Sequence, residues 1–213
     1  MSRKLPVYLL LDTSGSMYGE PIEAVKVGIE TMLSALRNNP YALETVNLSV
    51  ITFDSNAKQV VPLTEVSQFQ KPEITASGCT AMGEALKLAT ERADQEVKKN
   101  TFEQKGDWKP MMFIMTDGAP TDDLDKGIAE FKKYKWGVVV ACAAGSGAHT
   151  DTLKKITGNV VKLDTASPKD IEAFFQWISQ STITSSQKVE EGGAQAETLS
   201  ELPPPPPEVN IVL

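Results

Sequence analysis

A short segment near the N-terminus places one carboxylate and two hydroxyls at alternate positions. Asp12, Ser14 and Ser16 follow an apolar run in the sequence YLLLDTSGSMYG, residues 8–19. A loop that leaves a buried strand with this composition offers oxygen ligands. Hard cations such as Mg²⁺, Mn²⁺ and Ca²⁺ prefer oxygen donors over nitrogen or sulfur. If this segment binds a cation, other oxygen-bearing side chains at strand ends are expected to complete the site.

Two further loops carry side chains of the same chemistry. Asp117 follows a second apolar run, MMFIM, residues 111–115, and Thr80 precedes a helical pattern. In open α/β sheets, ligands bind beyond the carboxyl ends of the strands, where the strand order reverses. If the two strands are neighbours, Asp117 and the first carboxylate face one crevice. Gly15 and Gly118 remove side chains where a backbone must approach a ligand closely.

These loops supply two carboxylates and three hydroxyls, and no histidine or cysteine in an evident ligand position. Few charged donors favour a small ion that keeps several waters, so we expect Mg²⁺, at roughly 2.0–2.1 Å from its oxygens, with Mn²⁺ or Ca²⁺ as alternatives. Two acids balance a divalent charge, and neutral hydroxyls leave the ion able to accept a carboxylate from another molecule. The residues thus predict a docking site.

The hydrophobic pattern predicts strands that alternate with helices. Apolar runs indicate strands at 6–11, 48–53, 57–63, 111–115, 137–145 and 160–163. Spacings of three and four indicate helices at 20–37, 80–99, 124–134, 152–156 and 168–183. The strand at 57–63 is predicted to pair antiparallel with the strand at 48–53 across the turn at 54–56, and Pro62 places it at an edge of the sheet. We expect a doubly wound α/β fold, with a mostly parallel central sheet, one antiparallel edge strand and helices on both faces.

Composition narrows the classes of partner and the compartment. The chain has 213 residues and a net charge of −7, which disfavours nucleic acid and anionic membranes as partners. Its two cysteines, Cys79 and Cys142, are too few for a disulfide framework and fit a reducing compartment. No segment approaches the roughly 20 apolar residues of a membrane span, and the basic start lacks a cleavage site. We expect a cytoplasmic protein.

The composition changes after about residue 185. Serine, glutamate, glycine and glutamine dominate there, followed by five prolines at 203–207. Such a segment cannot bury enough surface to fold alone. We therefore expect a folded domain at 1–184 and a flexible, acidic and proline-rich tail at 185–213. The terminal EVNIVL could add a strand to a partner's sheet edge; a disordered solubilising tail is the alternative.

The motif set resembles that of von Willebrand factor A (VWA) domains. Asp12, Ser14 and Ser16 match the family's D-x-S-x-S signature, and Thr80 in SGCTAMGEAL and Asp117 in IMTDGAPTDD match the remaining metal-site positions in order. The resemblance covers nearly all of the predicted domain and implies a Rossmann-like VWA fold with a metal-ion-dependent adhesion site (MIDAS). It implies that the three hydroxyls ligate the cation directly, that the two acids often act through water, and that a partner's acidic residue takes the sixth position.

The resemblance also suggests a setting and partner contacts. The segment LLLDTSGSMYGEPIEA looks closest to bacterial TerY-type proteins of tellurium-resistance clusters. That likeness implies protein partners from a tellurite or stress-resistance system, such as kinase or phosphatase modules. Gly15, Met17, Gly78 and Gly118 flank the motif residues and are the predicted partner contacts. Within the family, partner binding can be coupled to a shift of the last helix.

Other functions fit these residues less well, so we expect a binding module and no enzyme. A haloacid-dehalogenase-like phosphatase would use Asp12 as nucleophile, but it needs a second acid where Ser14 stands. A receiver domain with Asp54 as phosphoacceptor leaves the paired serines unexplained. A Ser–His–Asp hydrolase lacks its G-x-S-x-G elbow, and His149 is the only histidine. A metal-free scaffold, in which the hydroxyls only satisfy loop backbone, is the remaining alternative.

Helix starts offer simpler roles for several polar residues. Thr80 has an alternative interpretation as the cap of its helix. Asp122 and Asp123 are predicted to begin the next helix, where they favour its dipole. Ser167 and Pro168 form the expected start of the last helix, as cap and first-turn proline.

Overall fold

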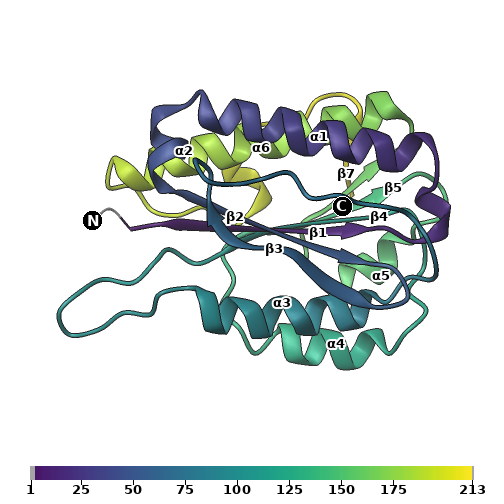
Figure 1. The fold of residues 1–213 in the computed structure, drawn as a ribbon, viewed down its shortest axis with the longest axis horizontal. Helices are drawn as coiled ribbons and strands as arrows, with labels where there is room; N and C mark the ends of the chain where they lie inside the picture. The colour runs from purple at the N-terminus through teal and green to yellow at the C-terminus, as the bar shows by residue number, and fades with distance from the viewer. Residues whose placement is uncertain (1–2, 213) are drawn as a thin grey trace.

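The apolar runs of the sequence form the strands of one seven-stranded sheet, in a computed structural model that describes residues 3–212. The strands lie in the order β3-β2-β1-β4-β5-β6-β7 (Figure 1). Their bounds are β1 (Leu5–Asp12), β2 (Val46–Phe53), β3 (Ala57–Glu65), β4 (Met111–Thr116), β5 (Val139–Ala144), β6 (Val160–Leu163) and β7 (Val209–Val212).

Helices cover both faces of this sheet. Figure 1 shows α1, α2 and α6 on one face and α3, α4 and α5 on the other. The helices are α1 (Glu20–Arg37), α2 (Pro40–Thr45), α3 (Met82–Glu96), α4 (Leu124–Phe131), α5 (Thr150–Lys154) and α6 (Pro168–Glu190), with short 3-10 turns η1 (Gly15–Met17) and η2 (Leu199–Glu201). Within residues 3–212, no helix combines the length and the apolar character needed to cross a membrane.

The predicted fold class is confirmed, with one addition. Strands β2, β1, β4, β5 and β6 pair in parallel, and β3 pairs antiparallel with β2 at one edge. Strand β7 pairs antiparallel with β6 at the opposite edge, so the sheet has a second antiparallel edge strand that the sequence did not predict. Strand β3 contains Pro62, and an edge position tolerates its missing amide hydrogen.

The segment after residue 184 is folded against the domain, so the expected flexible tail is wrong. Helix α6 continues to Glu190, and the chain then returns along it. The indole Nε1 of Trp177 in α6 donates to the carbonyl of Pro203 at 2.8 Å, and Leu202 and Val209 are buried. The segment has too little apolar surface to fold alone, but it packs on an existing helix and pairs with an existing strand edge.

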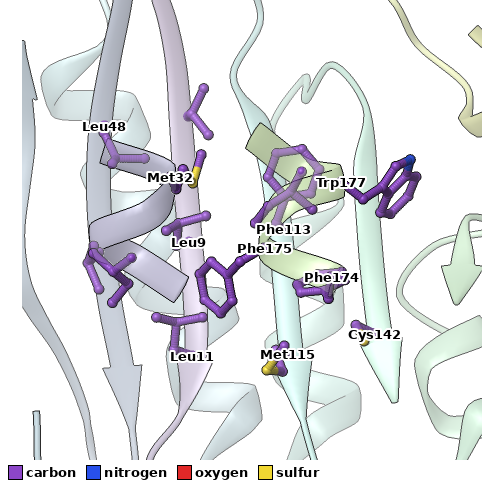
Figure 2. Close-up of a cluster of buried hydrophobic side chains, with 14 of the residues drawn as sticks. Leu9, Leu11, Met32, Leu48, Phe113, Met115, Cys142, Phe174, Phe175 and Trp177 are labelled. Carbon is purple, nitrogen blue, oxygen red and sulfur yellow. The ribbon is translucent and has the colours of Figure 1, made fainter. Parts of the chain in front are cut away.

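Each inner strand is buried on both faces, which explains its continuous apolar sequence. In β1, Leu9 and Leu11 join the core beneath α1 and α6, and Figure 2 shows them in the same cluster as Phe174 and Phe175 of α6. Tyr8 and Leu10 of β1 face the second core, beneath α3 and α4. The sheet is therefore held rigidly between two apolar layers, and its strand ends are fixed platforms for loops.

A close glycine contact fixes α3 against α4 on this second face. An added Cβ at Gly127 of α4 would overlap the backbone of Gly83 in the first turn of α3. Only glycine lets the two helices approach so closely at this point. Because the first turn of α3 follows directly after Thr80, this contact also fixes one of the loops with metal-ligand chemistry.

Candidate metal centre

Strands β1 and β4 are neighbours, so their final residues emerge at the same edge of the sheet. They pair in parallel with Leu11 opposite Met115. Asp12 ends β1, and Asp117 follows the last residue of β4. The condition under which the two carboxylates would face one crevice is therefore met.

Hydrogen bonds connect four of the five predicted ligand residues. One carboxylate oxygen of Asp12, Oδ1, accepts from the backbone amide of Ser14 at 2.8 Å, and Oδ2 accepts from the Thr116 hydroxyl at 2.5 Å. The hydroxyl oxygens of Ser14 and Ser16 are 3.1 Å apart, and the Ser16 hydroxyl donates to Asp117 Oδ1 at 2.7 Å. Oxygen atoms from the β1 and β4 loops thus form one connected cluster.

Thr80, the fifth predicted ligand residue, lies next to this cluster and does not cap its helix. The N-cap of α3 is Ala81, and no side chain at that position bonds to the helix. A Cβ built at Gly118 would lie 3.6 Å from Thr80 Oγ1, which places this hydroxyl beside the residue that follows Asp117. Within residues 3–212, no hydrogen bond occupies Thr80 Oγ1. The capping interpretation is wrong, and the hydroxyl is available as a ligand.

Backbone bonds hold the β1 loop against the loop that carries Thr80. The amide of Gly15 donates to the carbonyl of Gly78 at 3.1 Å, and the amide of Ser77 donates to the carbonyl of Thr13 at 2.8 Å. Gly78 has a φ of +71°, a conformation that L side chains rarely adopt. The two loops are therefore locked together without use of the candidate ligand hydroxyls.

Asp122 performs the capping role that the sequence assigned elsewhere. Its carboxylate accepts from the backbone amides of Gly83 at 3.0 Å and Glu84 at 2.8 Å, at the start of α3. Asp123 accepts from the amide of Lys126 at 3.1 Å and caps α4, as predicted. The prediction that both acids serve the next helix is thus right for Asp123 and wrong for Asp122, which joins the Asp117 loop to α3.

The two carboxylates of the cluster differ in exposure, and neither has a cationic partner within residues 3–212. Asp12 is 1% exposed, whereas Asp117 is half-buried and Ser16 is exposed. Burial raises the pKa of Asp12, opposed by hydrogen bonds from the Ser14 and Thr116 hydroxyls, and the charge of Asp117 raises it further. A divalent cation would supply the missing positive charge and become the largest local charge in the site.

The residues predicted to contact a partner divide into two groups. Gly15 and Gly78 are exposed and Gly118 is half-buried, beside the cluster. Met17 is fully buried in the core beneath α1, so its predicted partner contact is wrong: its side chain anchors η1 from below. Its neighbour Tyr18 is 80% exposed and was not among the predicted partner contacts.

Other side chains lie outside this donor set. Cys142 is buried in β5, Cys79 and His149 are exposed, and His149 only precedes α5. Among residues 3–212 there is no group of three or more His, Cys, Asp or Glu side chains that could hold a metal. A metal centre in this part of the chain therefore depends on hydroxyl ligands.

Thr116, whose hydroxyl donates to Asp12, was not among the predicted site residues, although it directly precedes Asp117 in the sequence.

The sequence model of the von Willebrand factor type A domain matches residues 7–181. The chain belongs to this family. VWA domains commonly mediate metal-dependent protein interactions, and a divalent metal typically occupies their MIDAS. An uncharacterized protein of Synechocystis, sll0103, is 36% identical over 123 residues, which cover 54% of this chain and 26% of that protein. The chain thus matches about a quarter of the length of this curated relative.

Solved VWA structures share the fold at low sequence identity. A von Willebrand factor type A protein from Catenulispora acidiphila has a TM-score of 0.64 and 18% identity, over 85% of this chain and 43% of that one. Proximal thread matrix protein 1 of the mussel byssus, with a zinc-occupied MIDAS, has a TM-score of 0.57 and 20% identity, over 84% and 45%. These likenesses show a common fold.

Proposed function

We propose that this VWA domain is a Mg²⁺-dependent docking module that binds an acidic residue of a protein partner and catalyses no reaction. One observation carries the proposal. The Ser16 hydroxyl lies between the Ser14 hydroxyl, at 3.1 Å, and the Asp117 carboxylate, at 2.7 Å, although the Asp117 loop is 101 residues further along the chain. Oxygens gathered in this way from separate loops suit a hard cation.

The five predicted ligand residues would have two kinds of role at such a site. Ser14, Ser16 and Thr80 would ligate the cation directly, and Asp12 and Asp117 would hold it through water. The bound ion supplies positive charge that a partner's carboxylate can approach. The exposed side of the cluster, at Ser16, is the side from which the carboxylate would enter.

A phosphatase-like role for Asp12 is the rival proposal, and the surroundings of this residue do not favour it. Both of its carboxylate oxygens accept hydrogen bonds, from the Ser14 amide and the Thr116 hydroxyl, and the side chain is 1% exposed. A nucleophilic carboxylate must reach phosphorus and needs an acid/base group nearby. Hydroxyl groups occupy the adjacent positions.

Isothermal titration with Mg²⁺ tests the metal site in wild type, in Ser14→Ala/Ser16→Ala, and in Ser34→Ala/Ser67→Ala, which changes two exposed serines outside the cluster. We expect saturable binding in wild type and in the outside pair, and none in Ser14→Ala/Ser16→Ala. Parallel titrations with Mn²⁺, Ca²⁺ and Zn²⁺ rank the cations. Equal Mg²⁺ binding by all three proteins would contradict this site, and absence of saturable binding in wild type would favour a metal-free scaffold.

We further propose that the docking partner belongs to a tellurite or stress-resistance system, for instance a kinase or phosphatase module. The likeness of the N-terminal motif segment to TerY-type proteins supports this proposal. A deletion strain of the source organism should lose tellurite tolerance and regain it with wild type but not with Ser14→Ala/Ser16→Ala. Unchanged tolerance in the deletion strain would refute this setting and leave the docking chemistry untouched.

A further inference from the structure

An apolar groove of about 700 Å³ lies between the start of α1, the loop before Ser77 and the start of α6. Ile22, Val27 and Pro168 contribute to its walls. Five large apolar side chains are exposed among residues 3–212, and two of them, Tyr18 at 80% and Val27 at 44%, line this groove. Exposed apolar side chains that gather in one groove, with charged residues around them, mark an interaction site.

The groove adjoins the candidate metal centre. Tyr18 lines one wall and directly follows η1, which carries Ser16. Thr75 lines another wall, three residues before Gly78, whose carbonyl accepts from the amide of Gly15. A partner segment that offers a carboxylate at Ser16 therefore has this groove as its adjoining surface.

The charges around the groove are mainly negative. Glu20, Glu23 and Glu172 line it together with a single cation, Lys26, whose ammonium bonds to Glu23 at 2.7 Å. Glu20 and Glu172 have neither a hydrogen bond nor an ion pair from their side chains within residues 3–212. Glu20 also favours the dipole of α1, but Glu172 lies beyond the first turn of α6, where that effect has faded.

We propose that the groove is a second binding site for the same protein partner, and that it takes an apolar side chain and a lysine or arginine close to the acid offered to the metal. This inference rests on the proposed docking function. The cation would attract the acid of the partner, and Glu20 and Glu172 would attract its base and repel further acids. The two sites together would fix the direction in which the partner segment lies.

Phage-displayed random peptides, selected on the immobilised full chain in Mg²⁺ and in EDTA, test this inference. Selection in Mg²⁺ on wild type should enrich peptides that combine an acid with an apolar residue and a lysine or arginine. A synthetic peptide from that selection should bind Glu20→Gln/Glu172→Gln roughly tenfold more weakly than wild type, since both exposed glutamates lose their attraction for its basic residue. The control Glu103→Gln/Glu190→Gln, which changes two exposed glutamates outside the groove, should bind as wild type does. Melting temperatures check that each variant is folded.

The outcomes separate the groove from the metal site. Enrichment of acids alone, lost in EDTA, would overturn the groove and support the proposed function. Enrichment of basic and apolar residues without an acid, in Mg²⁺ as in EDTA, would overturn the metal-dependent function and, with it, the shared partner. Unchanged affinity of the synthetic peptide for Glu20→Gln/Glu172→Gln would overturn the charge argument.

Discussion

Replacing Asp122 by alanine removes the side chain that joins the Asp117 loop to α3. The carboxylate accepts from the amides of Gly83 and Glu84, at 3.0 and 2.8 Å. These amides belong to the first turn of a helix and have no acceptor within it. The N-cap residue, Ala81, cannot replace the lost acceptor. We therefore expect Asp122→Ala to destabilise the protein.

The geometry gives the size of the effect. Loss of a capping side chain costs about 0.5–2 kcal/mol, and loss of a negative charge near a helix N-terminus costs about 0.3–1 kcal/mol. Together these terms lower the free energy of unfolding by about 1–3 kcal/mol. In a chain of this length each 1 kcal/mol corresponds to about 2–4 °C in Tm, so the expected fall in Tm is about 2–12 °C.

Urea denaturation at neutral pH measures the free energy, and a thermal melt gives Tm. Asp122→Asn keeps an acceptor oxygen without the charge and should lose less stability than Asp122→Ala. Because α3 begins beside Thr80, Asp122→Ala should also weaken Mg²⁺ binding, whereas Asp123→Ala, which loses the single cap bond of α4, should not. A loss below about 0.5 kcal/mol, within the range of ordinary surface substitutions, would refute the capping role. Undiminished Mg²⁺ affinity in Asp122→Ala would refute its role in positioning Thr80.

Three further predictions concern other parts of the fold. Gly127→Ala should lower the free energy of unfolding, measured by urea denaturation, by about 1–3 kcal/mol or more, because its methyl group overlaps the α3 backbone. The control Gly158→Ala has open space around the added methyl group and should be as stable as wild type. Burial, and then a neighbouring glutamate of α3, raise the pKa of Tyr8 above its usual 10.0, so the folded protein holds this proton more tightly than the unfolded chain does. Stability should therefore fall as pH rises above about 10. In melts at successive pH values Tyr8→Phe should lose less stability over that range, and an identical decline in both proteins would contradict the raised pKa of Tyr8. Ellman's reagent should titrate the exposed Cys79 in the native protein and reach Cys142, whose pKa is raised by burial, only after denaturation; rapid reaction of both thiols in the native state would contradict the packing of β5.

The residues of the candidate metal centre were predictable because their chemistry is local and the sheet topology is regular. Asp12 and Asp117 each follow an apolar run, and parallel strands of an open sheet place such endings at one edge. Ser14 and Ser16 share the loop of Asp12. Their convergence needed only one assumption, that β1 and β4 are neighbours, and the strand order satisfies it.

Contacts between distant segments were not predictable in the same way. Asp122 stands one residue before the cap of α4, a local pattern that fits a helix start, yet its carboxylate bonds to amides 38 and 39 residues earlier. Met17 alternates with exposed serine and tyrosine, so its burial follows from the position of η1 over the core. Helix α2 did have a local signal: Asn39 caps it with a 3.0 Å bond from the Ala42 amide, followed by a first-turn proline.

Strand β7 escaped prediction because its four residues have no structure of their own and depend on the edge of β6. A short β-prone segment after prolines is equally consistent with a free end. The structure of the domain, and not the composition of the segment, decides that it pairs. Local preferences in a sequence do not show which edge of the sheet is open for pairing.

The C-terminal strand changes how a recombinant fragment of this protein should be cut. A fragment ending at residue 181, where the family match stops, would lack the last turns of α6 and the whole of β7. It would leave the amides and carbonyls of β6 unpaired along an open edge, which invites intermolecular strand pairing and aggregation. Fragments intended for binding measurements should therefore extend through Val212.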